Sequence, residues 1–307
     1  MFNKRLILKE IKKCGLTKEI KPDELMKKHT SWRIGGIADF FCIPPDVISL
    51  KKVLLFAENH EIPIYVIGNG TNLWVPDEGI RGLVVKVSGA IDKIEYSGKM
   101  IKAGSGILLP DLVKKMTDKE LSGMEFAAHI PGTLGGAIIN NAGFNNKSMA
   151  DIVKQITVLD YKGNLIDLGR RKLNFSYRGI DIGIEKFVIT GAVLEMIEDE
   201  KVLINERIKK YYKKRKSSQP LEYLSAGCVF KNTEKESAGY LIEKAGAKGL
   251  TIGDAQVSEK HANFIINRGN ATARDILLLI EEVSDRVEKS FGIALEIEID
   301  IIGLNYN

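Results

Sequence analysis

The chain is poor in the residues that build disulfide frameworks and metal sites. It has only three cysteines in 307 residues, Cys14, Cys42 and Cys228, and no two of them form a C-x-x-C pair. This number and spacing argue against a disulfide scaffold and against a structural zinc site. The four histidines are scattered without i, i+4 pairing, so we expect no bound metal. They are His29, His60, His129 and His261.

Long apolar runs are missing as well. No stretch approaches the ~20 apolar residues that span a bilayer, and the N-terminal segment lacks the apolar core of a signal peptide. Hydrophobic residues make up 44% of the chain and charged residues 28%, as in ordinary globular proteins. We therefore expect a cytoplasmic protein with no membrane partner.

Charge is nearly balanced, which limits the classes of partner. The chain carries 45 Lys and Arg against 40 Asp and Glu, a formal net charge of +5. One basic run, Lys209–Lys216, contains two tyrosines; it suits the solvated end of a helix or the approach of an anionic substrate. Because no second basic patch accompanies it, we expect no nucleic-acid binding. The expected partners are small molecules, and the expected state is a monomer.

Glycine, in contrast, is abundant and concentrated in two uncharged loops. The run His129–Gly143 reads HIPGTLGGAIINNAG, and Gly68–Leu73 reads GNGTNL. Glycine lets the main chain approach a ligand closely and adopt positive φ, so that successive N–H groups can converge on an anion. Together the two loops predict a phosphate-bearing cofactor that is held by the main chain.

The order of helix-like and strand-like segments predicts a mixed α+β or α/β fold. Helical spacing of apolar residues indicates helices at 46–60, 108–118, 200–216, 238–245 and 272–289, the last with Thr272 as its N-cap. Strands are indicated at 63–67, 82–87, 91–96, 100–103, 156–161, 164–168, 186–196, 228–230 and 263–266. The polar segment Ser217–Pro220 is the expected domain boundary.

The closing segment, Leu295–Ile301, alternates apolar and acidic residues. A period of two would put Glu296, Glu298 and Asp300 on one face of a strand. That face is either a solvated sheet surface or the place of a functional carboxylate. If it is partly buried, mutual repulsion would raise the pKa of at least one of the three acids.

Three further positions carry candidate chemistry. Cys228 is either a small buried hydrophobic residue or, with Lys231 nearby, a thiol of lowered pKa that can act as acid or nucleophile. Arg178 is either a surface residue or a guanidinium fork aimed at a carboxylate or a flavin oxygen. The segment Gln256–Asn263 is rich in side-chain donors, which either cap the loop or bind a polar ligand.

Taken together, these segments resemble one enzyme family. The matching segments occur in family order over residues 29–303: His29–Gly36, Ile67–Leu73, Ile130–Gly136, Asn141–Gly143, Ser176–Arg178, Gln219–Pro220, Gly227–Asn232 and Gly253–Ala262. Eight segments in order are much more specific than any one of them. On these grounds the chain resembles the UDP-N-acetylenolpyruvoylglucosamine reductase (MurB) family. The run Lys186–Glu200 has no room for the extra tyrosine-bearing loop of one type of member, so the chain resembles the second type.

The resemblance implies an architecture. It is an α+β protein with an FAD-binding fold of the vanillyl-alcohol-oxidase (PCMH) type in two subdomains, followed by a C-terminal α+β substrate domain. We expect the first FAD-binding subdomain at residues 1–88, the second at 89–218 and the UDP-sugar domain at 219–303. The closing strand, 296–303, is an alternative member of the first subdomain.

The resemblance also implies an activity. It is the NADPH-dependent reduction of UDP-N-acetylglucosamine enolpyruvate to UDP-N-acetylmuramate through FAD, a cytoplasmic step of peptidoglycan precursor synthesis. The alternative is an FAD-dependent oxidase of the same fold that acts on an alcohol or a sugar. Arg178 would bind the substrate carboxylate, Glu298 would stabilise or protonate the intermediate, and Cys228 stands at the position of the proton donor.

Two of these positions depart from the commoner family pattern. Serine is more usual where this chain has Cys228, but a thiol, with a reference pKa of about 8.5, is the stronger acid. Ser225 is the alternative donor. Arginine is more usual where this chain has Asp300, which adds a like charge near Glu298 and would raise the Glu298 pKa if both are buried.

The same matches imply residues that bind FAD and residues that bind the UDP-sugar substrate, and they imply no residue that binds a metal ion. The expected FAD contacts are Arg33, Gly68, Asn69, Gly70, Thr71, Asn72, Leu73, Pro131, Gly132, Thr133, Gly135, Gly136, Asn141, Ala142 and Gly143. The expected substrate contacts are Tyr177, Lys231, Asn232, Gln256, Ser258 and His261.

Overall fold

A computed structural model of the chain describes residues 3–303. The chain divides into two compact units that do not follow its linear order. Unit 1 runs up to Pro22 and adds Asp39–Asn69 and Gly82–Tyr212; unit 2 comprises Asp23–Ala38, Gly70–Arg81 and the chain from Lys213 on. The three-domain division expected from the sequence stays a prediction.

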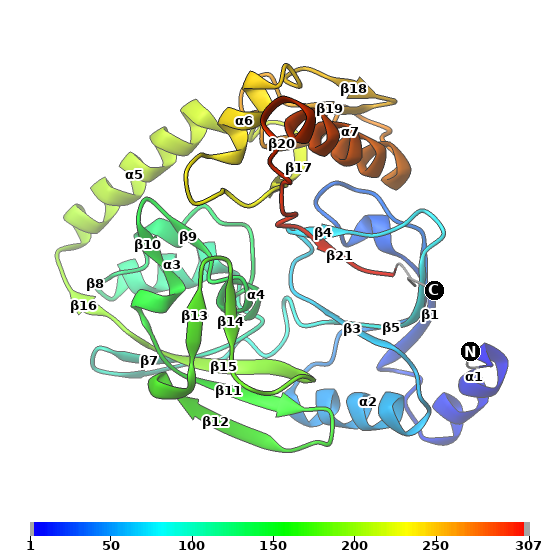
Figure 1. The fold of residues 1–307 in the computed structure, drawn as a ribbon. Coiled ribbons are helices and arrows are strands. Elements are labelled where there is room, and N and C mark those ends of the chain that lie inside the picture. Colours follow the sequence, from blue (N-terminus) through cyan, green and yellow to red (C-terminus); the bar gives the residue numbers. More distant parts are fainter. Residues whose placement is uncertain (1–2, 304–307) are drawn as a thin grey trace. The chain divides into compact units, whose positions relative to one another are not determined.

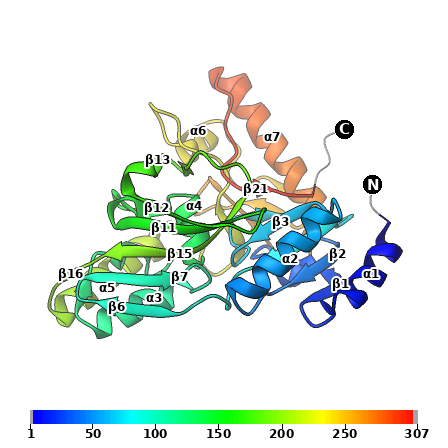
Figure 2. The same cartoon turned by 90° about the horizontal axis from the view of Figure 1, so that it is seen from below.

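The first part of the chain forms a four-stranded sheet of order β1-β2-β5-β3. Its elements are α1 (Lys4–Lys13), β1 (Ile20–Leu25), η1 (Met26–Lys28), β2 (Ile37–Cys42), α2 (Val47–Asn59), β3 (Ile64–Ile67), β4 (Leu73–Trp74) and β5 (Ile80–Lys86). Helix α2 begins where the Asp46 carboxylate accepts the Ser49 N–H at 2.7 Å. It buries Leu50, Val53 and Leu54 in a core shared with β5, and Figure 2 shows it alongside β3.

A second sheet, antiparallel with order β12-β11-β15-β7-β6, forms the body of unit 1. Leu109, Leu112 and Met116 of α3 pack against it. The elements of this part are β6 (Ile94–Ser97), β7 (Met100–Gly104), α3 (Leu109–Asp118), β8 (Leu121–Ser122), η2 (Glu125–Ala127), α4 (Leu134–Ile139), β9 (Gly143–Phe144), β10 (Lys147–Ser148), η3 (Met149–Asp151), β11 (Val153–Asp160), β12 (Leu165–Gly169), η4 (Arg170–Lys172), β13 (Asn174–Ser176), β14 (Gly179–Asp181), β15 (Phe187–Glu195), β16 (Ile197–Glu198) and α5 (Lys201–Ser218).

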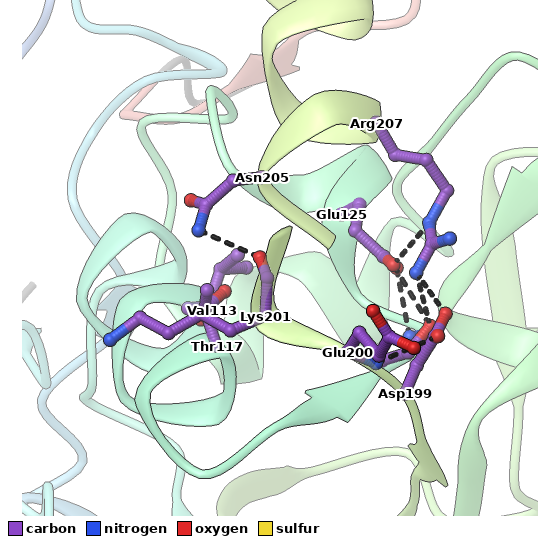
Figure 3. Close-up of polar contacts among 10 residues, drawn as sticks. Val113, Thr117, Glu125, Asp199, Glu200, Lys201, Asn205 and Arg207 are labelled. Atoms are coloured by element: carbon purple, nitrogen blue, oxygen red, sulfur yellow. Dashed lines mark hydrogen bonds and ion pairs between the residues drawn. The ribbon is translucent and has the colours of Figure 1, made fainter. Parts of the chain in front are cut away.

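A charged network fixes the first half of α5 within unit 1. Figure 3 shows Arg207, Glu125 and Asp199 pointing toward one another. Arg207 Nε donates to Glu125 Oε1 at 2.8 Å, and another guanidinium nitrogen donates to Asp199 Oδ2 at 2.5 Å. The other oxygen of Glu125 accepts the Gly123 N–H at 2.8 Å. Burial opposes ionisation of Glu125, but these hydrogen bonds outweigh it and hold its pKa below the usual range.

The C-terminal part forms a four-stranded sheet of order β17-β20-β19-β18 covered by α7 (Figure 1). The N-cap Thr272 forms a capping box with Asp275, as the sequence predicts, and α7 ends at Gly292 with φ 67°. Trp32, fully buried, donates from its indole to the Ile265 carbonyl at 2.8 Å. The elements are β17 (Leu224–Cys228), α6 (Ala238–Lys244), β18 (Thr251–Ile252), β19 (Ala255–Val257), β20 (Phe264–Asn267), α7 (Ala273–Phe291) and β21 (Asp300–Ile301).

The mixture of helices and largely antiparallel sheets confirms the α+β class, but two expected strands are wrong. The strand expected at 228–230 covers Leu224–Cys228 instead, because β17 pairs with β20 there. The closing strand shrinks to Asp300–Ile301, because among residues 3–303 it forms a regular ladder with the two-residue β4 alone. No helix within residues 3–303 combines the length and the apolar character needed to cross a membrane.

Candidate active site

In unit 1 the start of the first glycine loop, Gly68 and Asn69, lies against the second glycine loop. Asn69 Nδ2 donates to the Pro131 carbonyl at 2.8 Å, and Ser88 Oγ donates to Asn69 Oδ1 at 3.2 Å. A Cβ on Gly68 would lie only 2.5 Å from Thr133 Oγ1. Glycine at 68 is therefore required by the close approach of the two loops.

The first loop carries a run of unused main-chain donors. Within residues 3–303, the N–H groups of Gly68, Asn69, Gly70 and Thr71 donate to no protein acceptor. Main-chain donors in proteins are almost always paired with protein, water or ligand, and successive free N–H groups form anion sites. This donor set fits the diphosphate of the expected FAD.

The other glycines of the second loop pack closely against neighbouring residues. The Gly135 N–H donates to the Ser105 carbonyl at 2.8 Å, and the Gly136 N–H donates to Thr133 Oγ1 at 3.3 Å, which caps α4. A Cβ on Gly143 would lie 2.5 Å from a main-chain oxygen of the facing strand. These glycines shape the loop, since the N–H groups of Gly135 and Gly136 are already used.

The end of the glycine run is tied to the turn that carries Arg178. Asn141 Nδ2 donates to the Ser176 carbonyl at 2.8 Å. Strands β13 and β14 pair Ser176 with Gly179, which leaves Tyr177 and Arg178 as a two-residue turn. The structure thus brings the glycine run and the expected carboxylate-binding arginine together within unit 1.

Three expected site residues other than glycine have a left-handed backbone. The φ angles are 59° at Arg178, 56° at Arg33 and 38° at Asn141. This region costs a residue with a side chain about 1 kcal/mol, and such strain is typical of functional positions. Arg33 is exposed, and the guanidinium of Arg178 lies 5.5 Å from the ring centre of the exposed Tyr177.

In unit 2 the continuation of the first loop lies against the closing segment. The Asp300 N–H donates to the Asn72 carbonyl at 2.8 Å, and β21 runs parallel to β4 with Asp300 opposite Leu73. Asn72 Nδ2 donates to the Glu298 carbonyl at 3.2 Å. At Gly70, where φ is 67°, a Cβ would overlap a main-chain oxygen at 1.8 Å.

Glu298 lies beside the strand that carries Cys228. Its N–H donates to the Val229 carbonyl at 2.7 Å. The other two acids do not form a buried row with it: Glu296 is exposed and paired with Lys231, and Asp300 is exposed. The burial required for the expected effect of Asp300 on Glu298 is therefore absent.

A β-bulge sets the direction of Cys228. Ser225 pairs with Ile266 and Cys228 with Phe264, so β17 has one more residue than β20 between the two pairs. The extra residue is accommodated around Gly227, whose φ is 84°. Because Ile266 and Phe264 share a face of the sheet, the bulge puts Ser225 and Cys228 on one face as well. Both alternative donors are thus compatible with the fold.

Asn263 is a positioning residue that the sequence did not reveal. Its side chain accepts the Phe230 N–H at 2.9 Å and donates to the Phe230 carbonyl at 2.8 Å, while its own carbonyl accepts the Val229 N–H at 2.9 Å. It is 3% exposed. These bonds fix the main chain directly after Cys228. The only sequence signal was its place at the end of the donor-rich segment Gln256–Asn263.

Several expected substrate contacts make local hydrogen bonds. Asn232 Oδ1 accepts the Ala238 N–H at 3.0 Å, and Ser258 Oγ accepts the His261 N–H at 3.4 Å. Gln256 Nε2 donates to a main-chain carbonyl at 3.3 Å. Burial lowers the pKa of His261, which favours a neutral ring. Their contacts with substrate stay predictions.

Comparison with known proteins connects these features with a family. The model for the C-terminal domain of UDP-N-acetylenolpyruvoylglucosamine reductase matches residues 219–302, and an FAD-binding domain model matches residues 38–169. The reductase of Desulforamulus reducens is 44% identical over 284 residues, 92% of this chain and 94% of that protein. The reductase of Moorella thermoacetica is 44% identical over 289 residues, 94% and 95% of the two chains.

A solved structure agrees with the sequence relatives. The crystal structure of the reductase MurB from Thermus caldophilus is 35% identical and has a TM-score of 0.79, with 92% of this chain and 98% of that chain covered. The fold and the FAD-binding domain define an FAD-dependent oxidoreductase with the vanillyl-alcohol-oxidase type of fold. The chain belongs to the UDP-N-acetylenolpyruvoylglucosamine reductase family. The predicted family and fold class are confirmed, and membership of its second type stays a prediction.

Proposed function

We propose that the protein reduces UDP-N-acetylglucosamine enolpyruvate to UDP-N-acetylmuramate with NADPH and FAD, a cytoplasmic step of peptidoglycan precursor synthesis. The observation that carries this proposal is the connected set Asn72, Glu298 and Val229 in unit 2, which joins the donor-rich loop to the strand of Cys228. The membership of the chain in the reductase family supports the choice of substrate.

The main chain would hold the cofactor. The N–H groups of Gly68–Thr71 would bind the FAD diphosphate, and the run Ile130–Gly143 would pack beside it. When bound, FAD supplies the redox chemistry, the transfer of a hydride from NADPH to the terminal carbon of the enolpyruvyl group.

Three side chains would then act on the substrate. Negative charge develops on the carbon next to the carboxylate, so Arg178 would bind that carboxylate and stabilise the charge. Cys228 would donate its Sγ proton to this carbon, which leaves a thiolate on the protein. Glu298 would stabilise or help to protonate the same intermediate. Ser225, on the face of Cys228, is the alternative donor.

An anaerobic cycle tests this function. Purified protein should show a visible flavin spectrum, which NADPH should bleach. Adding the enolpyruvyl sugar without oxygen should restore the spectrum. A colourless protein that does not take up added FAD would contradict the proposal. Restoration of the spectrum by oxygen alone, with no response to the sugar, would favour an alcohol or sugar oxidase instead.

A further inference from the structure

The basic run Lys209–Lys216 of α5 contains two tyrosines that pack against unit 1. The other six residues of the run are basic, and all but Arg215 are exposed. Tyr211 packs against the core of unit 1, while Tyr212 is 42% exposed. Both tyrosines belong to unit 1, whose last segment ends at Tyr212. Their rings therefore connect this part of the helix with the body of the unit.

The two rings contact opposite ends of the second glycine run. The ring of Tyr212 lies 4.8 Å from the ring of His129, measured between ring centres, with 43° between the planes. The ring of Tyr211 meets the ring of Phe144 edge to face, at 5.9 Å and 86°. Both distances fall within the roughly 4.5–7 Å at which aromatic rings attract each other. His129 opens the run His129–Gly143 and Phe144 directly follows it, so one helix holds both ends of the loop.

The residues between these two ends carry features expected to bind the cofactor. The Pro131 carbonyl accepts Asn69 Nδ2 at 2.8 Å, which joins the run to the first glycine loop. Within residues 3–303, the N–H groups of Gly132 and Thr133 donate to no protein acceptor. Because main-chain donors are almost always paired, these two N–H groups remain available to a ligand. The way in which the ends of the run are held therefore decides where these donors lie.

The run needs support from outside because its own sequence gives it little stiffness. It contains four glycines, and glycine has more conformational freedom than any other residue. Ordering a flexible loop when a ligand binds costs free energy, so a loop that is ordered beforehand binds more tightly. The helix that carries the two rings is itself fixed to unit 1 one turn earlier, by the Arg207 network (Figure 3). The rings can thus restrict the loop before the cofactor arrives.

We propose that Tyr211 and Tyr212 are positioning residues that hold the run His129–Gly143 in the geometry that binds FAD. The role belongs to the rings, because both contacts are ring contacts. The proposal rests on the cofactor-binding part of the proposed function alone, and it does not depend on which substrate the flavin reduces.

The affinity for FAD tests the proposal without any substrate. Dilution of the flavin-loaded protein, followed by the fluorescence of the released flavin, gives the dissociation constant. Tyr212→Ser removes the ring beside His129 and should raise this constant about fivefold. Tyr211→Leu combined with Tyr212→Ser should raise it about twentyfold, because both ends of the run are then released. Tyr211→Phe and Tyr212→Phe keep the rings and should stay close to wild type.

Hydrogen exchange of the same loaded proteins separates positioning from general stability. In the double variant the peptide that covers His129–Gly143 should exchange faster, while β11 of the central sheet should exchange as in wild type. A positioning role predicts this local effect, since the contacts lie at the ends of the run. Equal acceleration in β11 would assign the two rings to general stability and overturn the proposal.

Tyr96→Ser is the matched control. Tyr96 lies on β6 of unit 1 and is 45% exposed, close to the 42% of Tyr212, and its ring faces the Lys119 ammonium at 5.6 Å. This variant should change neither the FAD affinity nor the exchange of the run. An unchanged dissociation constant in Tyr212→Ser, or an equal rise in Tyr96→Ser, would overturn the proposal. A weakened FAD affinity in Tyr212→Ser, in an enzyme that does not reduce the sugar, would overturn the proposed function and leave the role of the two tyrosines standing.

Discussion

Unit 1 and unit 2 carry expected site residues of different kinds. In unit 1 the features are mostly main chain: glycines that allow two loops to touch and the N–H groups of Gly68 and Asn69, which remain available to an anion. In unit 2 it is side chains, Cys228 and Glu298, placed by a bulge and by hydrogen bonds from Asn263 and Asn72. We propose a corresponding division of labour, in which main-chain groups of the glycine loops bind the cofactor and side chains of unit 2 supply proton chemistry.

The largest expected effect comes from removing the acid in unit 2. Cys228→Ala should slow flavin reoxidation by the enolpyruvyl sugar by roughly 10²–10⁴-fold, about 3–5 kcal/mol, because the proton donor is lost. Reduction by NADPH should stay near normal, and Cys228→Ser should retain much of the rate. Stopped-flow absorbance of the two half-reactions measures this. A normal rate in the alanine variant would assign the proton to Ser225 or water.

A side-chain network of unit 1 outside the site should affect stability and not chemistry. Arg207→Ala leaves the Glu125 carboxylate, which is 8% exposed, without its cation. Loss of a fully buried partner costs ~3–5 kcal/mol, but the Arg207 side chain is 37% exposed. The free energy of unfolding should therefore fall by about 2 kcal/mol. Lys201 lies on the same helix as Arg207 and forms an exposed ion pair with Asp118 of α3. Lys201→Ala breaks this pair and should lower the free energy of unfolding by at most about 0.5 kcal/mol. Urea unfolding compares the two; equal losses would contradict the account.

A smaller effect, on the affinity for FAD, is expected from adding one methyl group where the two glycine loops touch in unit 1. Gly68→Ala forces the loop away from Thr133, so FAD should bind about tenfold more weakly, about 1.4 kcal/mol. Gly169→Ala, where a Cβ meets open space, is the matched control. Flavin fluorescence titration gives both dissociation constants. Unchanged affinity in Gly68→Ala would show that the contact between the two loops does not shape the cofactor site.

The smallest effect is a pH dependence of unit 1. The folded-state pKa of Glu125 is lowered, so its ionised carboxylate stabilises the fold above the unfolded pKa of about 4.3, and this contribution is lost as the pH falls through the folded pKa. Glu125→Gln should therefore flatten the fall in unfolding free energy below about pH 4.3. Urea titrations between pH 3 and 6 measure it. The same slope in both proteins would show that other carboxylates dominate.

Main-chain features of the site were predictable from the sequence, because glycine marks places where the main chain approaches other groups closely or adopts positive φ. The two loops that the sequence singles out lie in contact at Asn69 and Pro131, and Thr272 caps its helix as predicted. Side-chain placement was less predictable. The bulge at Gly227 shortens the strand expected beyond Cys228, and its partner strand lies some forty residues away in the chain. The sequence shows Lys231 three residues after Cys228, but the pairing of Lys231 with Glu296 is a tertiary contact that spacing cannot reveal.

One measurement tests the division of labour most directly: the rate of sugar-dependent reoxidation in Gly68→Ala saturated with FAD, beside Cys228→Ala under the same anaerobic conditions. We predict a rate close to wild type in Gly68→Ala, because its defect lies in cofactor affinity, and a loss of at least roughly 10²-fold in Cys228→Ala. A comparable loss in the saturated Gly68→Ala protein would contradict the separation of cofactor binding from proton chemistry.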